Sequence, residues 1–284
     1  MMHPYKKNPP DWTNNEFLNE LKVFTSIYKT RPLKENKGGM MFPHMFATFF
    51  MLRKLKPKLV IESGIFKGQS TWLIEKSVPD AEILSIDMDL KQRVYISNRA
   101  KYSNIDFKYH DFSNIPEDTL VFFDDHQSHI DRIRESKFFN IKHIILEDNY
   151  PALCGDFLTI RHVYSGSGFS HPLTFKNIIK TTYLLFNQFF KKKISNKYYI
   201  SLDQINSRLR DRNPDFIIFR NIEKIIETYF EFPPIINFDH KWGHGTTKEL
   251  YRTEKPLADL DKLDLKDLSK ELQSYNYITY IKLK

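Results

Sequence analysis

The sequence predicts an α/β fold with a doubly wound, mostly parallel sheet, and two observations carry this prediction. Short apolar runs rich in β-branched residues recur in the first half of the chain, among them Leu59–Ile61 and Ile83–Ile86. Such runs are typical of strands that are buried on both faces. Segments with helical spacing of apolar residues separate the runs, and strands that alternate with helices form parallel sheets. Ligands of such sheets bind at the carboxyl ends of the strands.

The composition fits a globular protein. Of the 284 residues, 41% are hydrophobic and 15% are aromatic, which is enough to bury a core. The formal net charge of +8 suits an anionic ligand, and no nucleic-acid-binding motif is present, so no nucleic-acid partner is expected. Cys154 is the single cysteine, which excludes a disulfide framework and favours a reducing, cytoplasmic location. We find no signal-peptide core or bilayer-spanning run and expect no stable membrane insertion.

Two helices are expected before the first strand. Apolar residues recur at helical spacing over residues 15–28 and 43–55. The loop Gly38–Met41 lies between them and is interpreted either as a lid over a ligand or as an ordinary connection. Residues 1–56 are therefore predicted to form an N-terminal helical segment with a possible lid, ahead of a ligand-binding core over residues 57–150.

The rest of the chain is organised around residues 59–71, whose sequence is LVIESGIFKGQST. The apolar strand is followed by Gly64 and Gly68, which allow a tight turn and a close approach of a ligand to the backbone. Ser70 or Thr71 is expected to cap the helix that follows. A strand, a glycine turn and a helix N-terminus together predict a nucleotide-type binding unit. A tight turn with no ligand is the alternative.

This glycine pattern is neither of the two commonest phosphate-binding motifs. The dinucleotide fingerprint is absent because residue 66 is Phe, and the phosphate loop is absent because Gln69 stands where lysine is needed. Asp87 ends the next predicted strand, 25 positions after Glu62, where nucleotide-binding folds hold the ribose hydroxyls. A simple surface carboxylate is the alternative for Asp87.

Acidic residues also follow the next strands. A helix is predicted over residues 90–101, a strand over 105–110, a strand over 119–123, a helix over 130–139 and a strand over 143–146. The strand at 119–123 is followed by Asp124, Asp125, His126 and His129, and the strand at 143–146 by Glu147 and Asp148. Neighbouring parallel strands bring such carboxylates to one edge, where they suit Mg²⁺. His126 or His129 could then remove a proton from a substrate hydroxyl. Compensation of the carboxylates by Arg132 is the alternative to a cation.

The second half of the chain is less regular. Residues 151–255 are interpreted as an insertion over the substrate cleft, with helices at about 173–191 and 222–230 and a strand at 215–219. Residues 256–284 are expected to close the core with a charged helix near 260–272. The final strand, residues 277–283, is expected to pair at the edge of the sheet.

These motifs resemble the metal-dependent class I S-adenosylmethionine (SAM)-dependent methyltransferases related to the macrolide-sugar O-methyltransferases and the cephalosporin hydroxylase family. The resemblance covers about residues 40–150. The matched residues are Glu62, Gly64, Gly68, Ser70, Glu147 and Asp148. The segment after the fourth strand departs from the family's Asp-x-x-His pattern, because Asp124 precedes His126 by two residues and Asp125 precedes His129 by four.

The resemblance implies a Rossmann-like methyltransferase fold and a function. Glu62, Gly64 and Gly68 would cradle the methionine part of SAM, and Asp111 would lie where the adenine binds. Mg²⁺ would be held by Asp124 or Asp125 with the Glu147 and Asp148 pair. The expected activity is O-methyl transfer to a hydroxylated small molecule, with a sugar or polysaccharide unit favoured, and the enzyme could be a homo-oligomer. A non-catalytic SAM or nucleotide binder, and a hydroxylase or glycan-processing enzyme on the same fold, remain the alternatives.

Overall fold

A computed structural model describes residues 6–150, 157–165, 216–232, 235, 268, 271 and 276–284 of the chain. The predicted helix at 173–191 and all but two residues of the predicted helix at 260–272 lie outside these ranges. Within them, no helix is long and apolar enough to cross a lipid bilayer.

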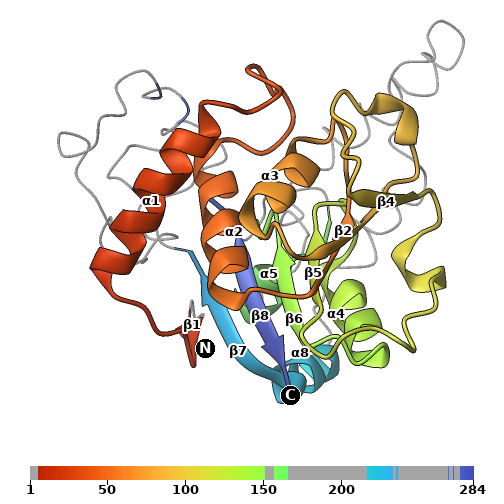
Figure 1. The fold of residues 1–284 in the computed structure, drawn as a ribbon. Coiled ribbons are helices and arrows are strands. Elements are labelled where there is room, and N and C mark those ends of the chain that lie inside the picture. The colour runs from red at the N-terminus through yellow and green to blue at the C-terminus, as the bar shows by residue number, and fades with distance from the viewer. Residues whose placement is uncertain are drawn as a thin grey trace, which may run out of the picture.

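The centre of the fold is an eight-stranded sheet with the strand order β1-β7-β8-β6-β5-β2-β3-β4 (Figure 1). Its strands are β1 (Lys6–Lys7), β2 (Leu59–Ser63), β3 (Glu82–Ile86), β4 (Ala100–Ser103), β5 (Leu120–Phe123), β6 (His143–Leu146), β7 (Ile226–Glu231) and β8 (Thr279–Leu283). The strands from β4 to β6 run parallel to one another, whereas β8 is antiparallel to both of its neighbours. The predicted fold class is confirmed.

The strand order reverses between β2 and β5. From β2 the chain proceeds outward through β3 to β4, and it then returns to the other side of β2 to build β5 and β6. In a doubly wound sheet, this switch point leaves a crevice at the carboxyl ends of the strands, where ligands bind. The loops after β2 and β5 are therefore the expected walls of a site.

Helices cover both faces of the sheet. They are α1 (Asn14–Tyr28), α2 (Phe42–Leu55), α3 (Gln69–Ser77), α4 (His129–Phe138), α5 (Ile160–Ser165) and α8 (Phe216–Ile225). Strand residues alternate between two cores: Val60, Phe122 and Ile145 pack with α1, α2 and α3, and Ile61, Val121 and Ile144 pack with α4, α5 and α8. This alternation is the period of two that a sheet buried on both faces requires.

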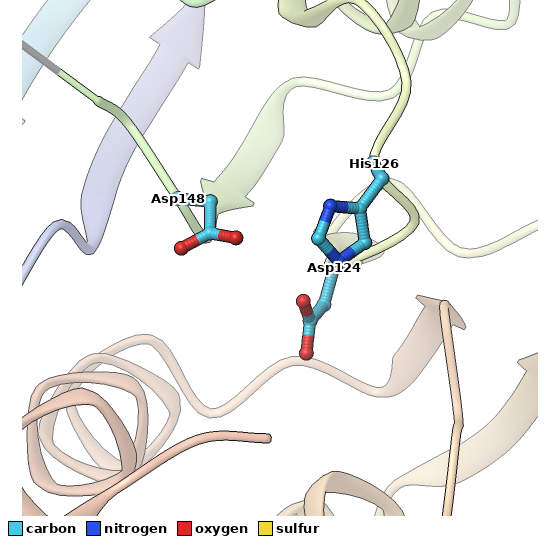
Figure 2. A group of neighbouring side chains, drawn as sticks. All are labelled: Asp124, His126 and Asp148. Atoms are coloured by element: carbon cyan, nitrogen blue, oxygen red, sulfur yellow. The ribbon is translucent and has the colours of Figure 1, made fainter. Parts of the chain in front are cut away.

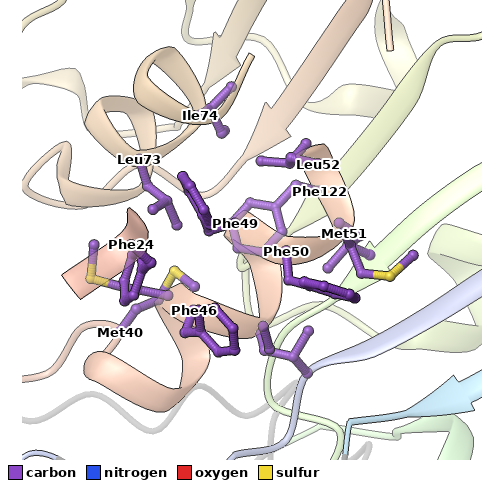
Figure 3. Close-up of a cluster of buried hydrophobic side chains, with 14 of the residues drawn as sticks. Phe24, Met40, Phe46, Phe49, Phe50, Met51, Leu52, Leu73, Ile74 and Phe122 are labelled. Atoms are coloured by element: carbon purple, nitrogen blue, oxygen red, sulfur yellow. The ribbon is translucent and has the colours of Figure 1, made fainter. Parts of the chain in front are cut away.

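The helix α2 lies in the middle of the first core (Figure 3). Every residue from Phe42 to Leu52 is buried, and full burial of one such aromatic or aliphatic side chain contributes about 1.5–3 kcal/mol. The helix ends at Lys56, which has a left-handed backbone, one residue before Pro57. The predicted bounds of the two N-terminal helices, 15–28 and 43–55, differ from those of α1 and α2 by one residue.

The region between β3 and β5 differs from its prediction. Residues 90–101 do not form a helix, because only Leu90–Gln92 make a 3₁₀ turn and β4 begins at Ala100. The predicted strand at 105–110 contains instead the 3₁₀ turn Phe107–Tyr109. Its apolar pattern reflects one anchor, Phe107, whose ring packs against those of Phe112, Phe123 and Phe139.

The C-terminal elements also differ from their prediction. The predicted strand at 215–219 is wrong over its described residues, 216–219, which belong to the helix α8, and the predicted helix at 222–230 is divided between α8 and the strand β7. Short apolar runs do not distinguish helix from strand. The final strand forms as expected, but it does not lie at the edge, because β8 inserts between β6 and β7.

Candidate active site

A cavity of about 380 Å³ lies at the switch point. Four parts of the chain form most of its walls: the loop before α2, the glycine turn between β2 and α3, the loop that follows β3 and the loop that follows β5. Its lining includes Asn36, Gly38, Gly39, Met40, Ser63, Gly64, Phe66, Gln69, Ser70, Asp87, Met88, Asp106, Asp124, Asp125, His126 and Arg132. The volume lies within the range of small-molecule sites.

The glycine turn accepts no side chain at either of its glycines. Gly64 has φ +98° and Gly68 has φ +88°, a region that favours glycine. A Cβ atom at Gly64 would overlap the backbone carbonyl of Asp124, and one at Gly68 would overlap that of Tyr95. Gly68 is also the N-cap of α3, so the predicted caps Ser70 and Thr71 are wrong, and both residues lie inside the helix.

Glu62 stabilises the elements that flank the glycine turn, and it is not among the residues that line the cavity. Its carboxylate is fully buried and accepts hydrogen bonds from Thr71 Oγ1 at 2.6 Å and from Ser85 Oγ at 2.5 Å. Burial raises the pKa of Glu62. Since Thr71 is on α3 and Ser85 is on β3, the Glu62 side chain links β2 to the helix α3 and to the strand β3 by hydrogen bonds. Of the residues predicted to cradle SAM, Gly64 and Ser70 border the cavity, whereas Glu62 and Gly68 lie behind it.

Asp87 borders the cavity and also holds the glycine turn in place. Its Oδ2 accepts hydrogen bonds from the backbone N–H groups of Ile65 at 2.8 Å and Phe66 at 2.9 Å, and its Oδ1 accepts one from the N–H of Asp89 at 2.8 Å. A carboxylate has about four lone-pair positions, so this arrangement leaves acceptor capacity on the side of the cavity.

Asp111 is not brought to the cavity. It is exposed and accepts a hydrogen bond from the N–H of Ser113. Asp106 lines the cavity in its place. Because β4 ends at Ser103 and no strand follows at 105–110, the carboxylate nearest the end of β4 is Asp106. The rule that acidic residues follow strand ends would have found Asp106 if the strand bounds had been known.

Arg132 links three carboxylates beside the cavity. The buried guanidinium lies 2.8 Å from Asp125, 3.0 Å from Asp106 and 2.7 Å from Glu135. Asp125 also accepts a hydrogen bond from Ser63 Oγ at 2.6 Å. Burial opposes ionisation of Asp106, but the hydrogen bonds from Arg132 and the Lys108 N–H, together with the charges of Arg132 and Lys108, lower its pKa. The predicted metal ligand Asp125 is thus neutralised by Arg132, as the alternative interpretation allowed.

Three other side chains do come together at the acidic edge. Asp124, His126 and Asp148 place one donor atom each within 4.8 Å of the others (Figure 2). Asp124 directly follows β5 and Asp148 lies two residues after the end of β6, and these strands are parallel neighbours. Burial, and then the charge of Asp148, raise the pKa of Asp124 well above its usual value. Two carboxylates that are held this close fit a divalent cation, and Mg²⁺ is bound by one or two carboxylates with water in its other positions.

Glu147 is not a member of this group. Its Oε1 lies 2.5 Å from Nδ1 of His44, and both side chains are buried. His44 was not predicted, although a histidine within the otherwise apolar first turns of α2 is a signal that the sequence offers. The pair joins the N-terminal helix to the end of β6, so the predicted role of Glu147 as a metal ligand does not fit its surroundings.

His126 and His129 differ in their surroundings. His126 is exposed and borders the cavity. His129 is buried, its Nδ1 accepts a hydrogen bond from the N–H of Ile160 at 3.4 Å, and its Nε2 lies 3.0 Å from the Glu147 carbonyl oxygen. Nε2 must therefore carry the proton, and burial lowers the pKa of His129 to about 3. The predicted role of His129 as a base does not fit, because both ring nitrogens are used in the fold.

Comparisons with known proteins add the following. No family model and no curated protein match the chain. Among solved structures, CmcI with S-adenosylhomocysteine (SAH) is 16% identical, over 50% of this chain and 79% of that one, with a TM-score of 0.34. The SAH-bound methyltransferase PaMTH1 of Podospora anserina is 15% identical, over 50% of this chain and 63% of that one, also at 0.34. The O-methyltransferase from Bacillus cereus in complex with SAH is 12% identical, over 49% and 67%, at 0.29. Over about half of its length, the chain is similar to these solved methyltransferases.

Proposed function

We propose that this protein is a SAM-dependent O-methyltransferase that acts on a hydroxylated small molecule, with a sugar or polysaccharide unit as the favoured acceptor. The observation that carries the proposal is a cavity lined by the glycine turn and by Asp124 and His126, whose donor atoms lie within 4.8 Å of one of Asp148. A methyl donor and an acceptor hydroxyl can therefore meet in this cavity.

The glycine turn would hold the methionine part of SAM. Gly64 and Ser70 border the cavity there, and the missing side chain of Gly64 lets the turn pack against the Asp124 carbonyl at the end of β5. Asp87 would accept a hydrogen bond from a ribose hydroxyl through Oδ1, which accepts one hydrogen bond, from the N–H of Asp89. Such contacts contribute by fixing the sulfonium carbon in line with the acceptor oxygen.

The acidic residues would help to deprotonate the acceptor hydroxyl. Asp124 and Asp148 would hold a divalent cation, for which Mg²⁺ is proposed, and a bound cation makes a nearby hydroxyl easier to deprotonate. His126 would take the hydroxyl proton and release it to water. The acceptor oxygen then forms its bond to the methyl carbon as the bond between carbon and sulfur breaks, and the sulfur leaves as the neutral thioether of SAH.

Two measurements test the proposal. Calorimetry should detect binding of SAM and SAH to the purified protein, and incubation with SAM and a library of sugars and other hydroxylated compounds should yield a methylated product and SAH. Binding of SAH without any methyl transfer would favour the non-catalytic alternative. Absence of binding to either compound would reject the proposal.

A further inference from the structure

The loop between α1 and α2 is fastened to the glycine turn. Gln69, the first residue of α3, uses both ends of its amide on one residue of that loop: Oε1 accepts a hydrogen bond from Leu33 N at 3.2 Å, and Nε2 donates one to Leu33 O at 3.3 Å. Further along the loop, a Cβ atom at Gly38 would lie 4.0 Å from the ring of Phe66 in the turn. Residues Asn36–Met40, here named the strap, lie beside the turn, and all of them except Lys37 line the cavity.

Asn36 in the strap carries a buried acceptor that no described residue satisfies. The residue is 9% exposed and lines the cavity. Its Nδ2 donates a hydrogen bond to the Met40 carbonyl oxygen at 3.3 Å, which fixes the orientation of the amide. Its Oδ1 is buried and has no hydrogen-bond partner among the residues that the structure describes. Buried polar atoms in folded proteins are almost always paired, so an exception beside a cavity points to a ligand.

The strap is shaped around this amide. Gly39 makes a turn by donating its N–H to the Asn36 carbonyl oxygen at 3.1 Å. A Cβ atom at Gly39 would lie 2.5 Å from Asn36 Nδ2 and 2.9 Å from Asn36 Cγ. Any side chain at residue 39 would thus displace the amide from its position. The reason for a glycine here is the space that the Asn36 amide occupies, because the backbone of Gly39 does not have a positive φ.

We infer that Asn36 recognises the ligand of this cavity, and that its Oδ1 accepts a hydrogen bond from an ammonium group. The inference rests on the proposed function, because it takes the methionine end of SAM to lie between the glycine turn and the strap. At that end the α-ammonium is the hydrogen-bond donor of the ligand, and the amide oxygen of Asn36 is a buried acceptor in the strap. The strap lies upstream of every residue that matched the resemblance to methyltransferases, so no motif assigns it this role.

Paired ligands and paired variants test the inference. The ligands are SAH and its deamino analogue, in which hydrogen replaces the amino group, and calorimetry at pH 7 gives the ratio of their affinities. The variants are Asn36→Leu, which removes the amide at similar size, and Gly39→Ala, which displaces it. Asn114→Leu is the matched control, because it makes the same change at an exposed residue outside the cavity.

The wild type and Asn114→Leu should prefer SAH over the deamino analogue. A hydrogen bond to a charged group predicts that Asn36→Leu lowers this preference by about 10- to 100-fold while its affinity for the analogue is retained. Gly39→Ala should lower it in the same direction, and it carries the test if Asn36→Leu does not fold.

The experiment distinguishes failure of the role of Asn36 from failure of the proposed function. If the wild type binds SAH and both strap variants keep its preference for SAH, the role of Asn36 is overturned and the proposed function stands. Lower thermal stability with an unchanged preference would likewise assign Asn36 a structural role only. If the folded wild type binds neither compound, the proposed function fails, and the inference fails with it.

Discussion

The two walls of the cavity are built on different physical principles. The glycine wall, residues 63–70, is fixed by backbone geometry, because its glycines have left-handed φ angles and its N–H groups are held by Asp87. The acidic wall, residues 124–126 with the adjacent Glu147 and Asp148 that do not themselves line the cavity, is fixed by charge, since each of its carboxylates lies beside Arg132, a histidine or another carboxylate. Changes at the first wall should therefore act through shape, and changes at the second through protonation and metal binding.

The largest effect is expected at Gly64. A valine there must adopt φ near +98° and overlap the Asp124 carbonyl, so we expect Gly64→Val to abolish detectable SAH binding. Asn140→Val is the control, because it places the same side chain at a positive φ, 58°, at an exposed residue that does not line the cavity. Calorimetry gives the affinities and circular dichroism the fold. Unchanged SAH affinity in a folded Gly64→Val protein would contradict the proposed cofactor site.

The next effect separates the two histidines. His126→Ala should keep SAH affinity and thermal stability but lower the rate of methyl transfer by about 10²–10⁴-fold, as expected for loss of a general base. His129→Ala should instead lower the free energy of unfolding, because it leaves the N–H of Ile160 and the Glu147 carbonyl without their buried partner. Normal turnover in His126→Ala would place the base elsewhere, with His240 or His244 as the next candidates from the sequence.

A third comparison separates the two neighbouring acidic residues after β6. Asp148→Asn should weaken Mg²⁺ binding and the dependence of activity on Mg²⁺, while SAH affinity is largely kept. Glu147→Gln should leave Mg²⁺ affinity nearly unchanged and lower stability, because Glu147 pairs with His44. Chelation by EDTA followed by metal titration measures both. Full activity of the wild type in EDTA would remove the cation from the mechanism.

The smallest effect concerns the pH dependence of the free energy of unfolding that arises from His129, which is buried beside the acidic wall. His129 has a folded-state pKa of about 3, below its unfolded value near 6.5. Its neutral form stabilises the fold fully above pH 6.5, and this contribution is lost as the pH falls towards 3, by about 2 kcal/mol at pH 5. Denaturant unfolding at pH 7 and pH 5 should show that His129→Gln has a smaller loss than the wild type. The His110→Gln variant, which changes a partly buried histidine, should behave like the wild type, and equal losses in all three proteins would contradict the assignment.

The two walls also differed in how far the sequence could predict them. Glycine positions are specified by local backbone requirements, so the turn at Gly64 and Gly68 was found from the sequence. The partners on the acidic wall depend on contacts between distant segments. Nothing local indicates that Arg132 binds Asp125 or that His44 binds Glu147, so the predicted ligand set contained two carboxylates that are paired elsewhere.

The same distinction applies to the fold. Elements with strong periodicity, such as α1, α2 and the apolar strands β2, β5 and β6, were predicted closely. The region between β3 and β5 was not, because a single tertiary anchor, Phe107, and caps by Asp89 and Asp106 replace the expected helix and strand. Short apolar runs near residue 220 were ambiguous between helix and strand for the same reason.

The interior position of β8 has a consequence for the order of folding during synthesis. β8 is the last of the described strands to leave the ribosome, yet it pairs with both β6 and β7. Until then β6 is an edge strand with unpaired backbone groups. The loop after Asp148 also waits for β8, because Asn149 donates hydrogen bonds to Tyr277 O through its N–H and to Thr279 Oγ1 through its side chain. The glycine turn needs only residues that are made early, so a nascent chain can form its glycine wall well before its acidic wall is complete.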